Sequence, residues 1–263
     1  MPVTLEQILH STEQGLPALR NRRAALERDV RGRQTGRPSF RAALRRSAVA
    51  VIAEVKRRSP SAGSIQEDLD PGARAALYEA HGAAALSVLT DGPFFGGSMD
   101  DLRLAAERCS LPILRKDFIL DEVQILEARA AGASAVLLIA RVLPPRRLES
   151  LLRYAEDLGL EALVEVHAAP ELAVAVECKA GIIGVNSRDL DTFAIDTRAA
   201  WQLLRHVPAD RIAVAESGLA RKEDVIRVAE AGADAVLIGT ALSAATSPGG
   251  LLDELSSVQR SGR

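Results

Sequence analysis

The sequence predicts an α/β fold, a single (β/α)8 barrel with an N-terminal helical extension, and a repeated phrase is the first observation that supports it. AHGAAALSVL, AAGASAVLLI and EAGADAVLIG surround Gly82, Gly132 and Gly232. In each phrase the glycine is suited to close a helix in the left-handed conformation, and the apolar run after it resembles a strand buried on both faces. The glycines lie 50 and then 100 residues apart, multiples of the roughly 25 residues that a helix and a strand occupy with their loops.

The second observation is the number of such units along the chain. Further apolar runs bring the expected strands to eight, at 49–56, 85–89, 112–116, 135–139, 161–165, 181–186, 211–216 and 234–239. Amphipathic stretches separate the strands and follow the last one. They predict helices at 71–81, 98–108, 121–131, 144–158, 168–178, 196–206, 220–231 and 248–259.

The third observation is the length of 263 residues, which suits one α/β barrel as well as two ordinary domains. Eight alternating strands and helices favour a closed (β/α)8, or TIM, barrel. An open doubly wound sheet normally has fewer units, and the sequence lacks the GxGxxG turn of that fold. We therefore expect residues 1–263 to form a single barrel domain.

The first 47 residues precede the first expected strand and form the extension. Thr4-x-x-Gln7 resembles a capping box, which marks the start of a helix. Leucines, isoleucine and valine then recur at helical spacing up to Val30. This pattern predicts one or two extra helices packed on the barrel.

Composition excludes several classes of protein. The chain is 48% hydrophobic and 26% charged, as in globular proteins, and no apolar run reaches the roughly 18 residues that a membrane span needs. The start MPVTLEQILH has no signal-peptide pattern, so we expect a cytoplasmic protein without a membrane partner. Cys109 and Cys178 form no disulfide framework, and without a CxxC motif or a histidine cluster we expect no metal site.

Basic residues are unevenly distributed. Residues 1–47 contain ten arginines and four acidic residues, although the whole chain has a net charge of −2. A basic arm could bind nucleic acid, but acidic residues are interspersed and the aromatic side chains that stack on bases are scarce. We interpret this segment as a solvated helical face and expect no nucleic-acid partner. The chain has only four lysines among its 33 basic residues.

Charged side chains occur at strand ends where a barrel interior is normally apolar. Side chains alternate along a strand, so Glu54 and Lys56 share a face with Ile52, at the carboxyl end where barrel enzymes place their chemistry. The same reasoning applies to four further strands. Their polar ends are Lys116, Glu165, Asn186 with Arg188, and Glu216.

Two interpretations of these polar ends compete. Any one charge could belong to an ion pair that closes the barrel. A cluster favours chemistry, because removing a charged group from water costs several kcal/mol unless it is paired. Burial and neighbouring carboxylates could also tune Lys56 and Lys116 for proton transfer. Three histidines fall in expected helices, and His167, just beyond a strand, is suited to loop or capping duty.

The turns after the last two strands predict a phosphate site. They contain Ser217–Gly218 and Gly239–Thr240, where glycine lets backbone amides approach an anion and a helix N-terminus adds a favourable dipole. Small residues also suit tight turns, which is the alternative interpretation. Because many barrels share this arrangement, it predicts a phosphorylated small-molecule substrate without identifying it.

The motifs closely resemble the indole-3-glycerol-phosphate synthase family from about residue 5 to residue 255. The segments that carry the resemblance are IAEVKRRSPSAG (52–63), SVLTDGPFFGGS (87–98), LPILRKDFILDEVQILEARAAGA (111–133), GVNSRDL (184–190), AESG (215–218) and LIGTAL (237–242). EVKRRSPS and LRKDF are the specific motifs, whereas AESG and IGTAL are common to related phosphate barrels. One departure is Thr240, where the family commonly has serine.

The resemblance implies a reaction and the residues that catalyse it. The family closes the ring of 1-(2-carboxyphenylamino)-1-deoxyribulose 5-phosphate with loss of CO2 and water, in tryptophan biosynthesis and without a cofactor. Lys116 corresponds to the general acid that protonates the substrate carbonyl. Glu165 and Glu54 correspond to acid–base groups of the later dehydration, and Lys56 to a lysine near the substrate carboxylate. Whether Lys56 or Glu165 is the dehydration acid stays open.

The resemblance also implies binding residues and partners. Asn186, which the resemblance places among the catalytic residues, and Arg188 correspond to groups that orient the substrate carboxylate. The N-terminal helices are expected to cap the mouth. The other implied contacts are Pro60, Phe118 and Leu137 around the aryl ring, Ser59 and Glu216 against the substrate, and Ser217, Gly218, Gly239 and Thr240 around the phosphate. A monomer that associates at most weakly with other enzymes of the pathway is expected.

Two other functions of phosphate-binding barrels compete with this interpretation. Phosphoribosylanthranilate isomerase is a related barrel that uses a cysteine base early in the chain, but no cysteine precedes Cys109 here. A catalytically silent phosphate-binding subunit would have no reason to keep the complete set of costly buried charges. Both features favour the synthase interpretation.

Overall fold

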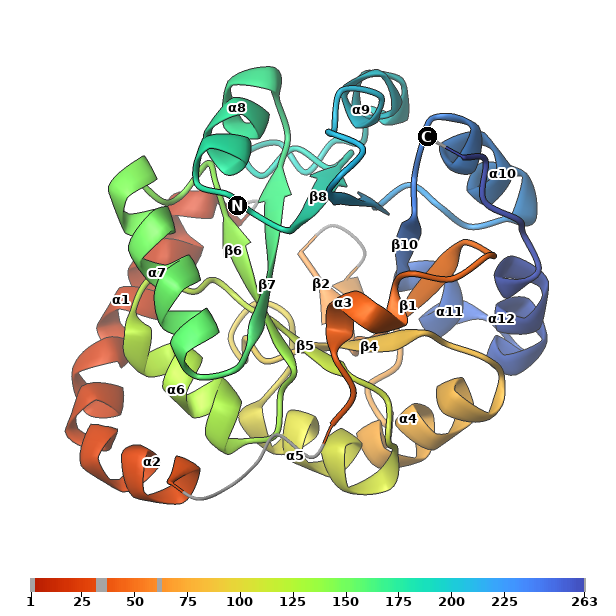
Figure 1. Ribbon diagram of the computed structural model, residues 1–263. Coiled ribbons are helices and arrows are strands. Elements are labelled where there is room, and N and C mark those ends of the chain that lie inside the picture. Colours follow the sequence, from red (N-terminus) through yellow and green to blue (C-terminus); the bar gives the residue numbers. More distant parts are fainter. Residues whose placement is uncertain (1–2, 32–36, 61–62, 263) are drawn as a thin grey trace.

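Eight parallel strands form a closed barrel in the computed structural model (Figure 1), which describes residues 3–31, 37–60 and 63–262. Residues 32–36 of the expected extension and 61–62 of the segment 52–63 lie outside the described residues. Neighbouring strands pair in the order β1-β10-β9-β8-β7-β6-β5-β4. The strands are β1 (Ala50–Val55), β4 (Ala85–Leu89), β5 (Ile113–Lys116), β6 (Ala135–Ile139), β7 (Glu161–Val166), β8 (Ile182–Asn186), β9 (Ile212–Glu216) and β10 (Ala235–Ile238). The predicted barrel is confirmed, and each strand end lies within one residue of its expected place.

A helix follows each barrel strand and packs on the outside of the sheet (Figure 1). These helices are α4 (Pro71–Ala80), α5 (Met99–Arg108), α6 (Glu122–Ala130), α7 (Pro145–Asp157), α8 (Ala169–Glu177), α9 (Thr197–Leu204), α10 (Lys222–Glu230) and α12 (Pro248–Ser256). Side chains cap the N-termini of several of these helices. The side chain of Asp70 accepts hydrogen bonds from two backbone amides of α4, and Asp121 forms a capping box with Gln124 at the start of α6. Helix α12 ends three residues before the predicted residue 259.

The alternation predicted for the first strand is confirmed by its two apolar layers. Val51 and Ala53 belong to the cluster between the sheet and the surrounding helices, whereas Ala50 and Ile52 belong to the barrel interior. Glu54 therefore also points inward, because it continues the interior face. The side-chain period of two thus carries the charged residues into the mouth formed by the carboxyl ends of the strands.

The extension runs beside α6, from the mouth toward the opposite end of the barrel. Helix α1 (Leu5–Asn21) starts with the predicted Thr4–Gln7 capping box, and Arg20 near its end pairs with Asp121 at 2.7 Å. Helix α2 (Arg23–Val30) packs along α6, and Figure 1 shows both red helices beside it.

Helix α3 (Phe40–Ala43) closes the barrel at the amino ends of the strands, which we call the base. Ser39 and the amide of Arg41 donate hydrogen bonds to Glu161, the first residue of β7. Phe40 and Leu44 are fully buried in the interior cluster. In the described part of the extension, three helices therefore precede the barrel, where the sequence predicted one or two.

A short strand pair and a short helix were not predicted. Strands β2 (Arg58–Ser59) and β3 (Gly63–Ser64) pair in antiparallel fashion between β1 and α4, and helix α11 (Thr240–Ala244) comes one residue after β10. Both are too short to show the hydrophobic periodicity on which the prediction relied. Within the described residues, no helix is long and apolar enough to cross a membrane.

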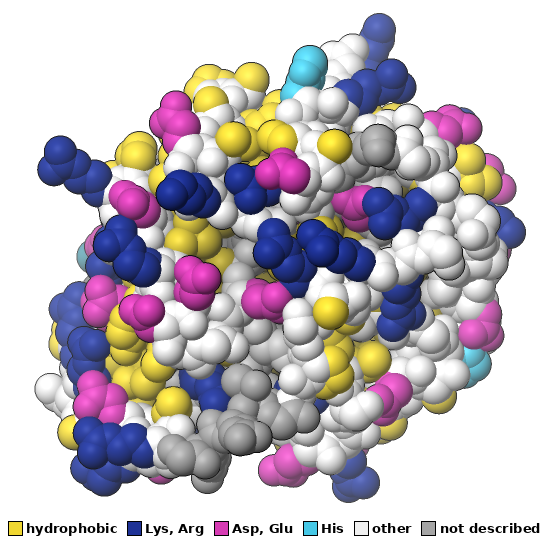
Figure 2. Space-filling model, in the orientation of Figure 1, with side chains coloured by type: hydrophobic (Ala, Val, Ile, Leu, Met, Phe, Trp, Pro, Cys, Tyr) yellow, Lys and Arg dark blue, Asp and Glu magenta, His cyan; other side chains and the backbone are white. Residues whose placement is uncertain are grey.

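Lysine and arginine side chains intermingle with acidic ones over the face shown in Figure 2. This mixed charge fits the interpretation of the basic extension as a solvated surface.

Candidate active site

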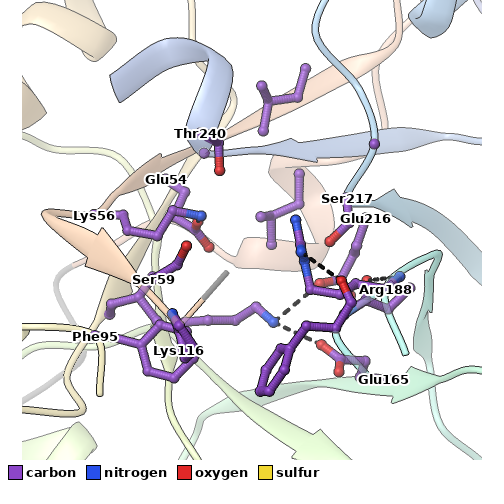
Figure 3. Close-up of a pocket in the computed structure, with 18 of the residues that line it drawn as sticks. Glu54, Lys56, Ser59, Phe95, Lys116, Glu165, Arg188, Glu216, Ser217 and Thr240 are labelled. Carbon is purple, nitrogen blue, oxygen red and sulfur yellow. Dashed lines mark hydrogen bonds and ion pairs between the residues drawn. The ribbon is translucent and has the colours of Figure 1, made fainter. Parts of the chain in front are cut away.

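A cavity of about 490 Å³ opens at the carboxyl ends of the barrel strands. All the residues that the sequence predicted for catalysis, substrate binding and phosphate binding line it, and Figure 3 draws many of them. They are Glu54, Lys56, Ser59, Pro60, Lys116, Phe118, Leu137, Glu165, Asn186, Arg188, Glu216, Ser217, Gly218, Gly239 and Thr240. The barrel topology thus brings together side chains that are up to 186 positions apart in the chain.

Lys116 lies between two buried carboxylates (Figure 3). Its Nζ is 2.7 Å from Oε2 of Glu165 on β7 and 3.2 Å from Oε2 of Glu216 on β9. The two glutamate side chains are 1% and 2% exposed. One ammonium group therefore serves two carboxylates, and these three groups alone carry one excess negative charge when all are ionised.

Burial and this charge imbalance separate the pKa values of the two glutamates. Burial raises the pKa of Glu165, but the charges of Lys116 and His167 outweigh it and lower the value to about 2. Burial raises the pKa of Glu216 to about 7, with Glu165 adding to the rise and Lys116 opposing it. Burial lowers the pKa of Lys116, but the surrounding carboxylates raise it well above its usual range. Lys116 and Glu165 are therefore an ion pair at neutral pH, whereas Glu216 is partly protonated.

A second lysine–carboxylate pair lies at the end of β1. Nζ of Lys56 is 2.7 Å from Oε1 of Glu54, whose other oxygen accepts a 3.5 Å hydrogen bond from Ser87. A side chain at Gly239 would collide with both Glu54 and Lys56, so glycine at the end of β10 makes room for the pair. Glycine at position 184 makes room for Glu216 in the same way.

One wall of the cavity is apolar. Phe118 follows β5, Leu137 comes from β6, and the ring of Phe95 lies 6.3 Å from that of Phe118 between centroids. Phe95 was not among the predicted site residues, although it lies in the segment SVLTDGPFFGGS. A phenylalanine in a loop has no periodic pattern to place it, so only the fold shows that it faces the cavity.

The loop after β8 holds two polar groups over the cavity. The backbone amide of Arg188 donates to Oδ1 of Asn186 at 3.0 Å, and its guanidinium donates to the carbonyl of Phe193 at 3.0 Å. Phe193 and its neighbour Ile195 also line the cavity and were missed by the prediction. Arg188 is therefore half-buried beside apolar side chains. Fewer water molecules reach its guanidinium there, so water competes less with an anionic ligand for this group.

The turns after β9 and β10 have the backbone geometry expected of an anion site. Ser217 and Gly218 both have left-handed backbones, with φ of 63° and 70°. For serine this conformation costs free energy, and strained residues of this kind cluster at functional sites. Thr240 is the first residue of α11, which follows β10, the strand adjacent to β9. Its side chain points toward the cavity in Figure 3. The unpredicted helix α11 thus adds a helix N-terminus to the two turns.

His167 lies behind Glu165 and does not line the cavity. Its backbone amide donates to Glu171 in the first turn of α8 at 2.7 Å, which agrees with the predicted capping duty. Its ring, however, is 7% exposed and reaches Glu165, a contact that the sequence did not predict. Among the described residues no group of histidine, cysteine and carboxylate side chains is arranged to hold a metal ion.

Sequence comparisons give one consistent result. The family model described as indole-3-glycerol phosphate synthase matches residues 5–255. The indole-3-glycerol phosphate synthase of Albidiferax ferrireducens is 46% identical over 257 residues, which cover 95% of this chain and 97% of that protein. Indole-3-glycerol phosphate synthase 2 of Streptomyces coelicolor is 50% identical over 210 residues, covering 80% and 81%.

Solved structures with more distant sequences share the fold. Thiamine phosphate pyrophosphorylase from Pyrococcus furiosus matches with a TM-score of 0.58 and 18% identity, over 81% of this chain and 95% of that one. The 3-hexulose-6-phosphate synthase from Salmonella typhimurium matches with a TM-score of 0.59 and 16% identity, over 79% and 97%. At these identities the likeness concerns the barrel alone.

Proposed function

The chain belongs to the indole-3-glycerol phosphate synthase family, and from this premise we propose a role for each group in the cavity. As a member it is a carboxy-lyase of tryptophan biosynthesis. It closes the ring of 1-(2-carboxyphenylamino)-1-deoxyribulose 5-phosphate to indole-3-glycerol phosphate, with loss of CO2 and water. The observation that carries the proposed roles is the position of Lys116 between Glu165 and Glu216, inside a cavity with an apolar wall.

Lys116 is the general acid of ring closure. The aromatic carbon that bears the carboxylate attacks the substrate ketone, and the ketone oxygen takes a proton from Nζ as the new bond forms. Two neighbouring carboxylates keep Lys116 charged in the free enzyme. Loss of CO2 then returns the bonding electrons to the ring. Because an ionised carboxylate leaves as neutral CO2, each turnover takes up one proton from solvent.

Glu165 and the Lys56–Glu54 pair serve the dehydration. The hydroxyl formed from the ketone must leave as water while a proton is lost from the ring carbon beside it. Glu165, ionised beside Lys116, is the base for that proton and can return it to Lys116 across 2.7 Å. Lys56 then donates a proton to the leaving hydroxyl, with Glu54 positioning its Nζ at 2.7 Å. This division of work assigns the acid to Lys56, the choice that the sequence left open.

The remaining residues bind and orient the substrate. We assign its carboxylate to Arg188 and Asn186, and its phosphate to the turns after β9 and β10. Holding the aryl ring and the sugar chain together in a dry slot supplies much of the rate enhancement of a cyclisation, because it removes rotational freedom before the reaction. The other proposed contacts are Ser59, Pro60, Phe118, Leu137 and Glu216 with the substrate, and Ser217, Gly218, Gly239 and Thr240 with the phosphate.

The extension and the cellular setting complete the proposal. Ile8 of α1 is fully buried in the interior cluster that also contains Phe118 and Leu190. This contact supports a role for α1 in closing one side of the mouth, within a single barrel domain. The ligand is a phosphorylated small molecule. We further propose a cytoplasmic monomer that binds neither nucleic acid nor membrane and associates at most weakly with other enzymes of the pathway.

One assay tests the proposed function directly. Purified protein given the carboxyphenylamino deoxyribulose phosphate, without added metal, is expected to produce the absorbance and fluorescence of an indole. Phosphoribosylanthranilate serves as the control substrate, because its turnover would indicate the related isomerase. Failure of the wild-type protein to form an indole would overturn the proposal.

A further inference from the structure

His167 forms a bridge between two carboxylates, one in the active site and one outside it. Nε2 of its ring is 3.4 Å from Oε1 of Glu165, and Nδ1 is 3.3 Å from Oε2 of Glu171. The His167 and Glu171 side chains are 7% and 18% exposed, and neither lines the cavity. The imidazole is therefore buried behind the catalytic pair and has no contact with the substrate space.

The two oxygens of Glu165 have different partners. Oε2 contacts Lys116 at 2.7 Å, and Oε1 faces His167. Lys116 and the His167 ring approach opposite oxygens of Glu165, and Asn186 also forms a hydrogen bond with this carboxylate. Rotation about the terminal bond of Glu165 would lose a contact, so the ring of His167 helps to determine which oxygen is presented to Lys116. Rigid support of this kind matters because a misplacement of about 1 Å can lower a rate by about a hundredfold.

From this geometry we infer that His167 is a positioning residue for Glu165, fixed in turn by Glu171. This inference rests on the proposed role of Glu165 as a catalytic base. Both ring nitrogens face carboxylate oxygens, so both must carry a hydrogen for the bridge to be complete, which requires the imidazolium form. A neutral ring would turn a lone pair toward one of the two carboxylates.

The charges around His167 support the imidazolium form. Burial lowers the pKa of His167, but Glu171 and Glu165 outweigh it and raise the pKa above its ordinary value, with a smaller contribution from Glu216. Beyond these groups, Lys116 faces Glu165, and Arg141 acts on Glu171. As the pH rises through the pKa of His167, the ring loses the positive charge that attracts both carboxylates, and its 3.4 Å contact with Glu165 weakens.

Two substitutions of His167 separate positioning from simple structural support. His167→Ala removes the contact and is expected to lower kcat about ten- to a hundredfold, with KM within twofold because the residue lies outside the cavity. His167→Gln can place an amide NH2 near the position of Nε2, so it is expected to restore kcat to within about threefold. We expect kcat of the wild-type enzyme to decline above the pKa of His167. Gln does not titrate, so this decline should be absent in His167→Gln.

His81→Ala provides the matched control. His81 also pairs with a carboxylate, with Nδ1 2.9 Å from Asp253, but this pair joins α4 to α12 away from the cavity. Its loss should change neither kcat nor the pH profile. The substrate phosphate and Glu216 titrate in every variant, so the difference between profiles isolates His167.

The outcomes decide the inference separately from the proposed function. Wild-type kcat in His167→Ala, or an unchanged pH profile in His167→Gln, would overturn the positioning role while the wild-type enzyme still forms indole. If His167→Ala does not fold, as judged by its melting curve, the pH profile of His167→Gln decides alone.

Discussion

The two ends of the barrel are closed by opposite kinds of side chains. At the base, Phe40 and Leu44 enter from α3 and are completely buried among apolar residues. At the mouth, Lys116, Glu165 and Glu216 lie within ion-pair distance in an open cavity. The apolar closure comes from the extension that precedes the barrel, whereas the charged side chains at the mouth come from β5, β7 and β9.

This difference separates stability from chemistry. Apolar burial at the base contributes about 25 cal/mol for each Å² removed from water, whereas burying charges at the mouth costs free energy that their pairing only partly offsets. A protein selected for stability alone would close both ends as it closes the base. Because burying charges at the mouth costs free energy, the mouth is the end of the barrel where we expect the functional site.

The largest expected effect on stability is at the base. Phe40→Ala removes a fully buried aromatic ring and should lower the free energy of unfolding by about 3–5 kcal/mol. The kcat of the folded protein should stay within about twofold. Chemical denaturation at a temperature where the variant remains folded measures the first, and steady-state kinetics the second.

Phe95→Ala at the mouth is the matched control. Its ring is only half-buried and lines the cavity, so it should cost less stability and raise KM instead. Equal losses of stability from the two phenylalanines would break the distinction between base and mouth.

A smaller effect concerns pH and the mouth. The pKa of Glu216 is raised from an ordinary 4.5 to about 7, so the folded state holds a proton that the unfolded state releases in this range. Glu216 therefore destabilises the fold progressively between about pH 4.5 and pH 7, by up to about 3 kcal/mol. The gain in stability of Glu216→Gln over wild type should therefore be larger at pH 8 than at pH 5. Denaturation of both proteins at the two pH values measures this gain.

Glu165→Gln should behave in the opposite way. The pKa of Glu165 is lowered to about 2, so its ionised form stabilises the fold above about pH 4.5, and this contribution is lost as pH falls toward 2. Loss of Glu165 should therefore destabilise the protein at neutral pH. An effect of Glu216→Gln that is the same at pH 5 and pH 8, or an effect of Glu165→Gln that is the same at pH 3 and pH 7, would contradict the pKa shift assigned to that residue.

The smallest effect lies in the turns near the base. Lys179 has a left-handed backbone with φ of 63° at the position where Gly82, in the equivalent turn, has φ of 82°. Lys179→Gly should stabilise the protein by about 0.5–1 kcal/mol, because glycine adopts this conformation without strain. Gly82→Ala is the reciprocal change, in a site with open space for the methyl group, and should destabilise by a similar amount. Thermal melting measures both, and shifts of the same sign would contradict the assignment.

The barrel could be predicted because its information is local and repeated. The glycine-ended helices and the strands of period two recur along the chain, so errors at one unit do not change the fold. The same period placed Glu54 and Lys56 inside. It also turned Arg115 outward, where the guanidinium is buried in ion pairs with Asp117 and Glu127.

The unpredicted parts depend on contacts between distant residues. Phe95, Phe193 and His167 reach the site from loops, where no periodic pattern specifies direction. For His167 the sequence offered a weak signal, its position two residues after Glu165 with Glu171 one helical turn further on. Only the fold shows that its ring turns back toward Glu165. Likewise, the sequence predicts that Lys116 and Glu216 approach the mouth, but their distance depends on strand register.

The most direct test of the central claim, that the charged mouth is catalytic machinery, is Lys116→Met with kcat and substrate affinity measured on the same sample. We expect no detectable indole formation, while the dissociation constant of the substrate stays within about tenfold, because the general acid is lost but the phosphate and carboxylate contacts remain. A variant that retained most of its activity would contradict the account, since the ion pairs at the mouth would then serve only to close the barrel.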